Sequence, residues 1–129
     1  MKCFRKAPII LAAILISGCI VASSRAEFTI SECLVINIDG PLDKDDDLSP
    51  WVEIYNSATT PEDLLGWYLT DDPADLTKWR IPRKAVPAHG YGLLHASGKD
   101  MNSLFSTEVH ANFTLNDSDD YLALVRPDG

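Results

Sequence analysis

Cysteine is scarce in this 129-residue chain, which contains three cysteines. Two of them, Cys3 and Cys19, lie within the first 26 residues. The chain is therefore not one of the small secreted domains that a disulfide framework holds together. The sequence instead predicts a domain that owes its stability mainly to a hydrophobic core.

Catalytic motifs are also missing. The sequence has no G-x-S-x-G, H-E-x-x-H or C-x-x-C pattern, so neither a nucleophile nor a zinc site can be assigned from spacing. Its histidines, His89, His95 and His110, are not paired at a metal-ligand spacing and are interpreted as surface or packing residues. Since an enzyme needs a nucleophile, a metal constellation or a carboxylate pair in a pocket, we expect no catalytic activity.

Basic residues are rare beyond residue 26. The chain has 11 Lys and Arg against 19 Asp and Glu, and four of the basic residues lie in the first 26 positions. The remainder therefore carries 7 basic and 19 acidic residues, a net charge of −12. Such a chain repels phosphate backbones and anionic lipid headgroups, so nucleic-acid binding is not expected. Cationic partners and divalent metal ions suit it better.

The first 26 residues have the pattern of a secretory signal peptide. A basic start is followed by an apolar run over residues 7–22 and by small residues at Ser24 and Ala26, the two positions that signal peptidase reads. The apolar run is short for a membrane span and contains Pro8, Ser17 and Gly18. We therefore expect residues 1–26 to be removed, leaving residues 27–129 as one domain that is secreted or resides in the cell envelope.

A second processing route is open. The tetrapeptide I-S-G-C at residues 16–19 resembles a lipobox, in which the cysteine is lipidated and becomes the first residue. In that case the protein would be a lipoprotein that Cys19 anchors to the membrane through its acyl chains.

Residues 27–129 show no segment with helical periodicity. Short apolar runs alternate with clusters of Asn, Asp, Ser, Thr, Gly and Pro at intervals of about ten residues, which is typical of a β-sandwich. The sequence predicts an all-β fold of about seven strands, at residues 27–37, 51–55, 64–69, 79–81, 90–97, 109–115 and 121–125.

Details of these runs predict which side chains face the core. Val52 and Ile54 alternate with polar or amphipathic neighbours, and Leu65, Trp67 and Leu69 do the same in the next run. Glu32 interrupts the alternation of the first strand, so we expect a bulge or a strand edge there.

The final residues, Pro127-Asp128-Gly129, form a turn signal after which a chain normally enters a partner strand. The domain is therefore expected to be truncated at its C-terminal end, or else closed by residues 121–125 as an edge strand.

Several segments, in order, resemble the lamin-tail domain, and specifically its bacterial exported type. They are I-S-E (30–32), W-V-E-I-Y-N (51–56), D-L-L-G-W-Y-L-T-D-D (63–72), T-K-W-R-I-P (77–82), G-Y-G-L-L-H-A-S-G-K-D (90–100), H-A-N-F-T-L (110–115) and Y-L-A-L-V-R-P-D-G (121–129). The resemblance implies an immunoglobulin-like β-sandwich and a non-catalytic role in adhesion or targeting. It carries over no catalytic residue. Relatives often have glycine where this chain has Asp46.

The loop D-K-D-D-D at residues 43–47 is the candidate metal site. Asp43, Asp45 and Asp47 alternate as in the first half of an EF-type calcium loop, and calcium is bound by hard oxygen ligands. The pattern then fails, because Leu48 stands where the tight turn needs glycine and Ile54 where the final acid belongs. Calcium binding and a solvated acidic loop both remain open.

Three functions fit these observations. The first is an interaction or adhesion module outside the cytoplasm, with a protein or polysaccharide partner at the cell envelope. The second is the N-terminal fragment of a secreted hydrolase whose catalytic domain followed residue 129. The third is a structural spacer. Because no catalytic constellation is visible, the sequence favours the interaction module.

Overall fold

Every regular element in the described part of the chain is a β-strand. The computed structural model describes residues 27–101 and 106–129, so the expected signal peptide and Cys19 lie outside the described residues. The strands are β1 (Phe28–Leu34), β2 (Trp51–Asn56), β3 (Glu62–Asp63), β4 (Tyr68–Thr70), β5 (Trp79–Arg80), β6 (Ala85–Val86), β7 (Tyr91–His95) and β8 (Ala123–Val125). The all-β prediction is confirmed. Within these residues no helix is long and apolar enough to cross a membrane.

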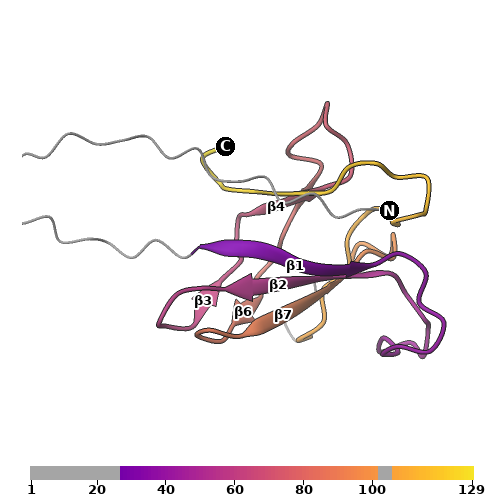
Figure 1. Ribbon diagram of the computed structural model, residues 1–129, viewed down its shortest axis with the longest axis horizontal. Coiled ribbons are helices and arrows are strands. Elements are labelled where there is room, and N and C mark those ends of the chain that lie inside the picture. The colour runs from indigo at the N-terminus through magenta and orange to yellow at the C-terminus, as the bar shows by residue number, and fades with distance from the viewer. Residues whose placement is uncertain (1–26, 102–105) are drawn as a thin grey trace, which may run out of the picture.

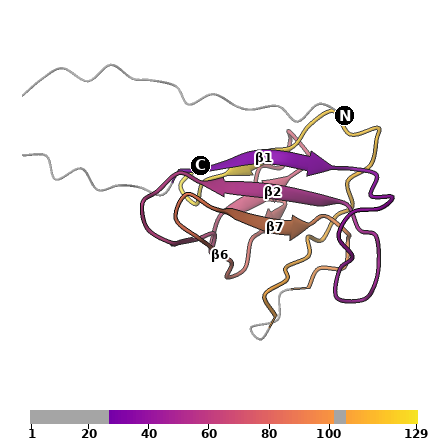
Figure 2. The ribbon, with the colours of Figure 1, turned by 60° about the horizontal axis from the view of Figure 1, so that its bottom comes forward.

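The strands form two three-stranded sheets and one short pair. The first sheet has the order β1-β2-β7 and the second the order β5-β4-β8, while β3 pairs with β6. All of these strand pairs are antiparallel. Figure 2 shows β1, β2 and β7 side by side, with the other strands behind them, and the long loop that joins β1 to β2 projects from one end of the domain in Figure 1.

The central strand β2 shows how the sequence pattern produces the core. Its side chains alternate between partly and fully buried, and Val52 and Ile54 are fully buried, as predicted. In the antiparallel register, Ile54 lies opposite Gly92 of β7. A Cβ atom at Gly92 would lie 2.8 Å from Val86 Cγ2, so glycine allows β6 to pack closely against β7.

Both sheets contribute to one hydrophobic core. An edge-to-face contact between Phe28 of β1 and Trp67 brings the sheets together, with ring centroids 5.2 Å apart. The buried cluster is completed by Val52, Ile54, Leu64, Leu69, Trp79, Ile81, Val86, Leu94, Ala96, Val109, Ala111, Phe113, Leu115 and Leu122. Each large side chain in such a cluster contributes about 1.5–3 kcal/mol by leaving water.

The predicted strand at residues 64–69 is only partly correct. The chain first makes a turn, in which Trp67 N–H donates to the Leu64 carbonyl and Gly66 adopts a φ of +88°. As a result β4 begins only at Tyr68, and Leu65 is 57% exposed instead of facing the core. Glycine suits this turn because the left-handed region costs it no steric clash.

Two other differences concern strand assignment. Residues 109–115 are not a strand, although burial alternates from Ala111 to Leu115 and isolated bridges form at His110 and Thr114. The two-residue strands β3 and β6 were not predicted. In contrast, the irregularity predicted at Glu32 is confirmed, because the β1–β2 register shifts between Ile30 and Glu32 and the Glu32 side chain is exposed.

Candidate functional site

The loop between β1 and β2 is organised around one buried carboxylate. The side chain of Asp43 has no exposed surface. Its Oδ1 accepts hydrogen bonds from the backbone N–H groups of Asp45 and Asp47, at 2.9 and 3.1 Å, and its Oδ2 accepts one from the Ser49 hydroxyl at 2.7 Å. Aspartate is favoured in such turns because its short side chain satisfies the backbone donors of the residues that follow.

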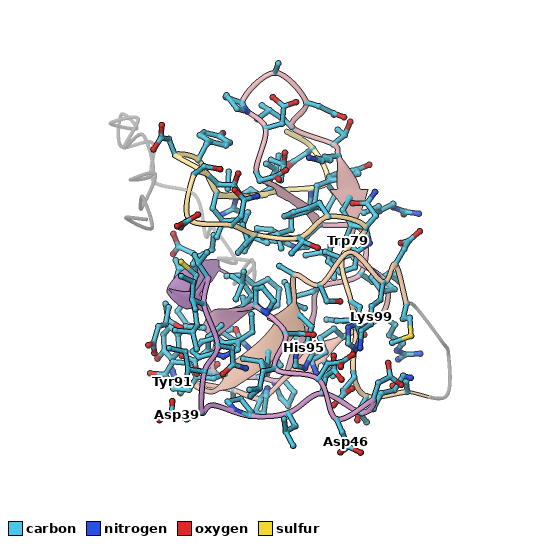
Figure 3. The ribbon with its side chains drawn as sticks, turned by 90° about the vertical axis from the view of Figure 1, so that its right-hand side faces the viewer. Asp39, Asp46, Trp79, Tyr91, His95 and Lys99 are labelled. Carbon is cyan, nitrogen blue, oxygen red and sulfur yellow. The ribbon has the colours of Figure 1, made fainter. Side chains whose placement is uncertain are left out.

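A lysine from a distant segment occupies the centre of the three aspartates. Lys99 Nζ lies 2.7 Å from Asp43 Oδ2, 2.9 Å from Asp45 Oδ2 and 2.8 Å from Asp47 Oδ2. In Figure 3, Asp46 lies at the outer edge of the molecule and Lys99 lies further in. One ammonium group thus donates to all three carboxylates, in the position where the sequence pattern predicts a metal ion.

The proton affinities of these groups reflect the same contacts. Burial by itself would raise the pKa of Asp43, but hydrogen bonds from Lys99, Ser49 and the backbone outweigh it and hold that pKa well below its usual range. Hydrogen bonds from Lys44 and Lys99 lower the pKa of Asp45. Partial burial works against the charge of Lys99, but its three carboxylate partners raise its pKa. Asp43, Asp45 and Lys99 are therefore charged at neutral pH.

The predicted aspartates are thus brought together, and they form a group that could hold a metal ion. One carboxylate oxygen from each of Asp43, Asp45 and Asp47 lies within 4.8 Å of the others. Sequence reasoning missed Lys99, because nothing in the segment around it indicates an acidic partner. It did single out Asp46, which has a φ of +63°, a conformation that glycine adopts more easily.

The same loop also exposes large apolar side chains. Four large hydrophobic side chains point into solvent there, with Ile38 the most exposed at 75%; the others are Ile36, Leu42 and Leu48. We call residues 36–48 the apolar loop. Asn37 braces it from inside, since its Nδ2 donates to the carbonyls of Pro41 and Ser49 and its Oδ1 accepts from Gly40 N–H. The exposed side chains therefore stand on a loop that hydrogen bonds hold in shape.

The three histidines divide into two groups. His89 is exposed, and its φ of +49° places it in a turn. His95 and His110 are buried, and their rings stack at a centroid distance of 4.8 Å with an interplanar angle of 17°. The interpretation of His95 and His110 as packing residues is correct as far as burial goes, but their pairing was missed because they belong to separate segments.

Comparison with known proteins gives one match. The sequence model of the Lamin Tail Domain family matches residues 22–129. No curated protein matched the chain, and no solved structure did either.

Proposed function

We infer the function from the family, because this chain belongs to the Lamin Tail Domain family. We propose that it is a non-catalytic interaction module acting outside the cytoplasm. Lamin tail domains are typically non-catalytic. The observation that carries the proposal is the apolar loop, residues 36–48, which exposes four large hydrophobic side chains at one end of the domain. Loops on a rigid β-scaffold are common binding elements.

The construction of the loop supports binding. Exposed hydrophobic side chains are costly when they gather on one element, and they often mark interaction sites. Here the ion pairs of Asp43 with Lys99 and the hydrogen bonds of Asn37 fix the loop before any partner arrives. A preformed loop loses little conformational entropy on binding, so more of the contact energy is available as affinity.

The charge of the loop indicates the chemistry of the partner. Exposed acidic side chains, among them Asp39 and Asp46, stand between the apolar residues (Figure 3). The partner we propose is therefore a protein of the cell envelope with an apolar patch that basic residues surround. Charge complementarity of this kind increases the association rate and weakens with added salt.

The test is capture of partners from a cell-envelope extract, with the full-length processed chain as bait. We expect the double variant Ile38→Ser, Leu42→Ser to lose a specific partner that the wild type retains, and we expect the captured complex to weaken at high salt. The matched control is Leu65→Ser, Leu76→Ser, which removes two exposed leucines outside the loop. Equal capture by all three proteins, or capture of a polysaccharide alone, would contradict the proposal.

Export is part of this proposal. The signal pattern at residues 1–26 supports removal by signal peptidase, and the lipobox-like residues 16–19 support anchoring through Cys19 as the alternative. Mass spectrometry of the protein from its native host separates the two routes. The first gives a mature chain that begins at Glu27, and the second gives a chain that begins at a lipidated cysteine. An uncleaved chain would contradict both.

We also propose that calcium binds at Asp43, Asp45 and Asp47 when Lys99 moves away. The three carboxylates already surround one cation, the Lys99 ammonium group. Because lysine is long and flexible, calcium can compete for the same oxygens, but it must first displace a bound charge. We therefore expect weak binding by the wild type and tighter binding by Lys99→Met, measured by calorimetric titration. If Lys99→Met shows no heat at millimolar calcium, the calcium proposal is wrong.

A further inference from the structure

The backbone holds His95 and His110 in fixed positions. His95, the last residue of β7, donates its N–H to the Val109 carbonyl at 3.0 Å and accepts from Ala111 N–H at 2.8 Å. On its other side, His110 exchanges two backbone hydrogen bonds with Met101, at 3.0 and 3.1 Å. The segment that carries His110 is therefore held from both sides, which fixes the backbone at both histidines, while their rings can still turn about the side-chain bonds.

Two ring nitrogens in this pair lack hydrogen-bond partners. His95 Nδ1 and His110 Nε2 are both buried, and neither has a hydrogen-bond partner among the described residues. His95 is 3% exposed and His110 is fully buried. Buried polar atoms are nearly always satisfied, so two such atoms in one cluster point to a bound ion or water molecule.

A carboxylate lies beside one of these nitrogens. Glu108 Oε2 is 3.5 Å from His110 Nε2, and one ligand atom from each of His95, Glu108 and His110 lies within 4.8 Å of the other two. Glu108 Oε2 also accepts the Lys44 N–H at 2.9 Å, which fixes its direction. Since the Glu108 side chain is 29% exposed, an ion can reach the buried nitrogens from that side.

We propose that His95, Glu108 and His110 form a binding site for Zn²⁺. Two imidazoles and one carboxylate are donors that zinc prefers, and bonds of about 2.0–2.1 Å in a tetrahedron place neighbouring ligand atoms about 3.3 Å apart. The 3.5 Å separation of His110 Nε2 from Glu108 Oε2 is close to that value. A metal ion binds an imidazole nitrogen in the plane of its ring, so the His95 ring must turn out of its stack on His110 to complete the set. A water molecule takes the fourth position.

Neighbouring groups support this assignment. Ser97 Oγ lies 2.8 Å from His110 Nδ1. When Nδ1–H donates to that hydroxyl, the lone pair of Nε2 faces the ion. Histidines that bind metal commonly have such a hydrogen-bond partner at the other ring nitrogen. The nearby Lys84 amine donates to the Thr107 carbonyl, and burial lowers its pKa, so it is a weaker competing cation than Lys99. The site is distinct from the aspartate cluster, whose hard oxygens suit calcium.

The test uses the untagged processed protein after treatment with a chelator. We expect Zn²⁺ to bind with one-to-one stoichiometry in calorimetry and to raise the melting temperature. We also expect Co²⁺ to give the visible absorption of a tetrahedral nitrogen–oxygen site, which Zn²⁺ abolishes. Glu108→Gln should weaken Zn²⁺ binding at least tenfold, and Ser97→Ala, a positioning variant, by about tenfold. His89→Gln removes a histidine outside the cluster and should bind Zn²⁺ as the wild type does.

The buried histidines need a second measurement, because His95→Gln or His110→Gln can fail to fold. Circular dichroism establishes the folded state of each variant, and the partly exposed Glu108 and Ser97 provide variants that do not open the core. The proposal is overturned if the folded wild type binds no Zn²⁺ at about 100 micromolar, an ordinary concentration for a calorimetric titration. It is also overturned if Glu108→Gln and His89→Gln bind Zn²⁺ equally well.

Discussion

Lys99 Nζ and Asp43 Oδ2 lie 2.7 Å apart and join residues that are 56 positions apart in the chain. This contact ties the loop between β1 and β2 to the segment that follows β7. Because the Asp43 side chain is fully buried, its charge depends on this partner and on the hydrogen bonds of the loop itself. The shape of the apolar loop therefore rests on a cation from another part of the fold.

Replacing that cation should destabilise the domain. A buried carboxylate left without its partner costs about 3–5 kcal/mol; because Lys99 is partly exposed, we expect Lys99→Met to lower the free energy of unfolding by about 1–3 kcal/mol. Urea denaturation in calcium-free buffer measures this loss. Lys44→Met is the control, since Lys44 pairs with Asp45 at the surface, and it should change stability by less than about 1 kcal/mol. Equal effects of the two variants would contradict the prediction.

Stability should fall in acid because of Asp43. Its pKa is lowered in the folded protein relative to about 3.9 in the unfolded chain, so the unfolded state takes up protons first. The stabilisation is complete above about pH 4 and is lost as the pH falls below that value towards the folded pKa. Urea denaturation at a series of acidic pH values measures the slope. In Asp43→Asn, the free energy of unfolding should depend less steeply on pH in this acidic range. An unchanged slope in that variant would show that other groups control the pH dependence.

Asp46→Gly should stabilise the loop. The φ of +63° at Asp46 lies in the left-handed region, where side chains other than glycine pay a steric cost of about 1–2 kcal/mol, although aspartate pays less than most. We expect a gain of about 0.5–1 kcal/mol in thermal or chemical denaturation. Asp46→Ala separates conformation from charge, because alanine removes the carboxylate but keeps the strain. If alanine stabilises as much as glycine does, the effect is electrostatic and the conformational account is wrong.

Asn56 provides a test of the core itself. Its buried Nδ2 donates to the carbonyls of Thr60, Val86 and Pro87 at 3.0–3.1 Å, which joins the end of β2 to the end of β6. Asn56→Asp would turn a carboxylate oxygen towards those carbonyls and bury a charge that keeps the Ala58 N–H as a donor at its other oxygen. We expect a loss of about 3 kcal/mol or more, or failure to fold. Asn112→Asp, at an exposed position, should cost less than about 1 kcal/mol; similar losses in both would refute the argument.

Some of these features could be predicted from short stretches of sequence. The alternation around Val52 and Ile54 identifies a half-buried strand because successive side chains of a strand point to opposite faces. The spacing of Asp43, Asp45 and Asp47 indicates a shared centre for the same local reason. The error at Leu65 shows the limit of such patterns, since a turn that begins at Leu64 shifts the alternation by one residue and turns Leu65 outward.

The sequence by itself determined the all-β class, the lamin tail family and the acidic loop, because periodicity, turn residues and family motifs are local properties of the chain. Only the tertiary structure decided that Lys99 is the cation at the aspartates, and that His95 and His110 stack beside Glu108. These contacts join segments that are separate in the chain. Their geometry depends on how the strands pair and where the loops return, and the long-range packing that fixes both leaves no periodic trace in the sequence.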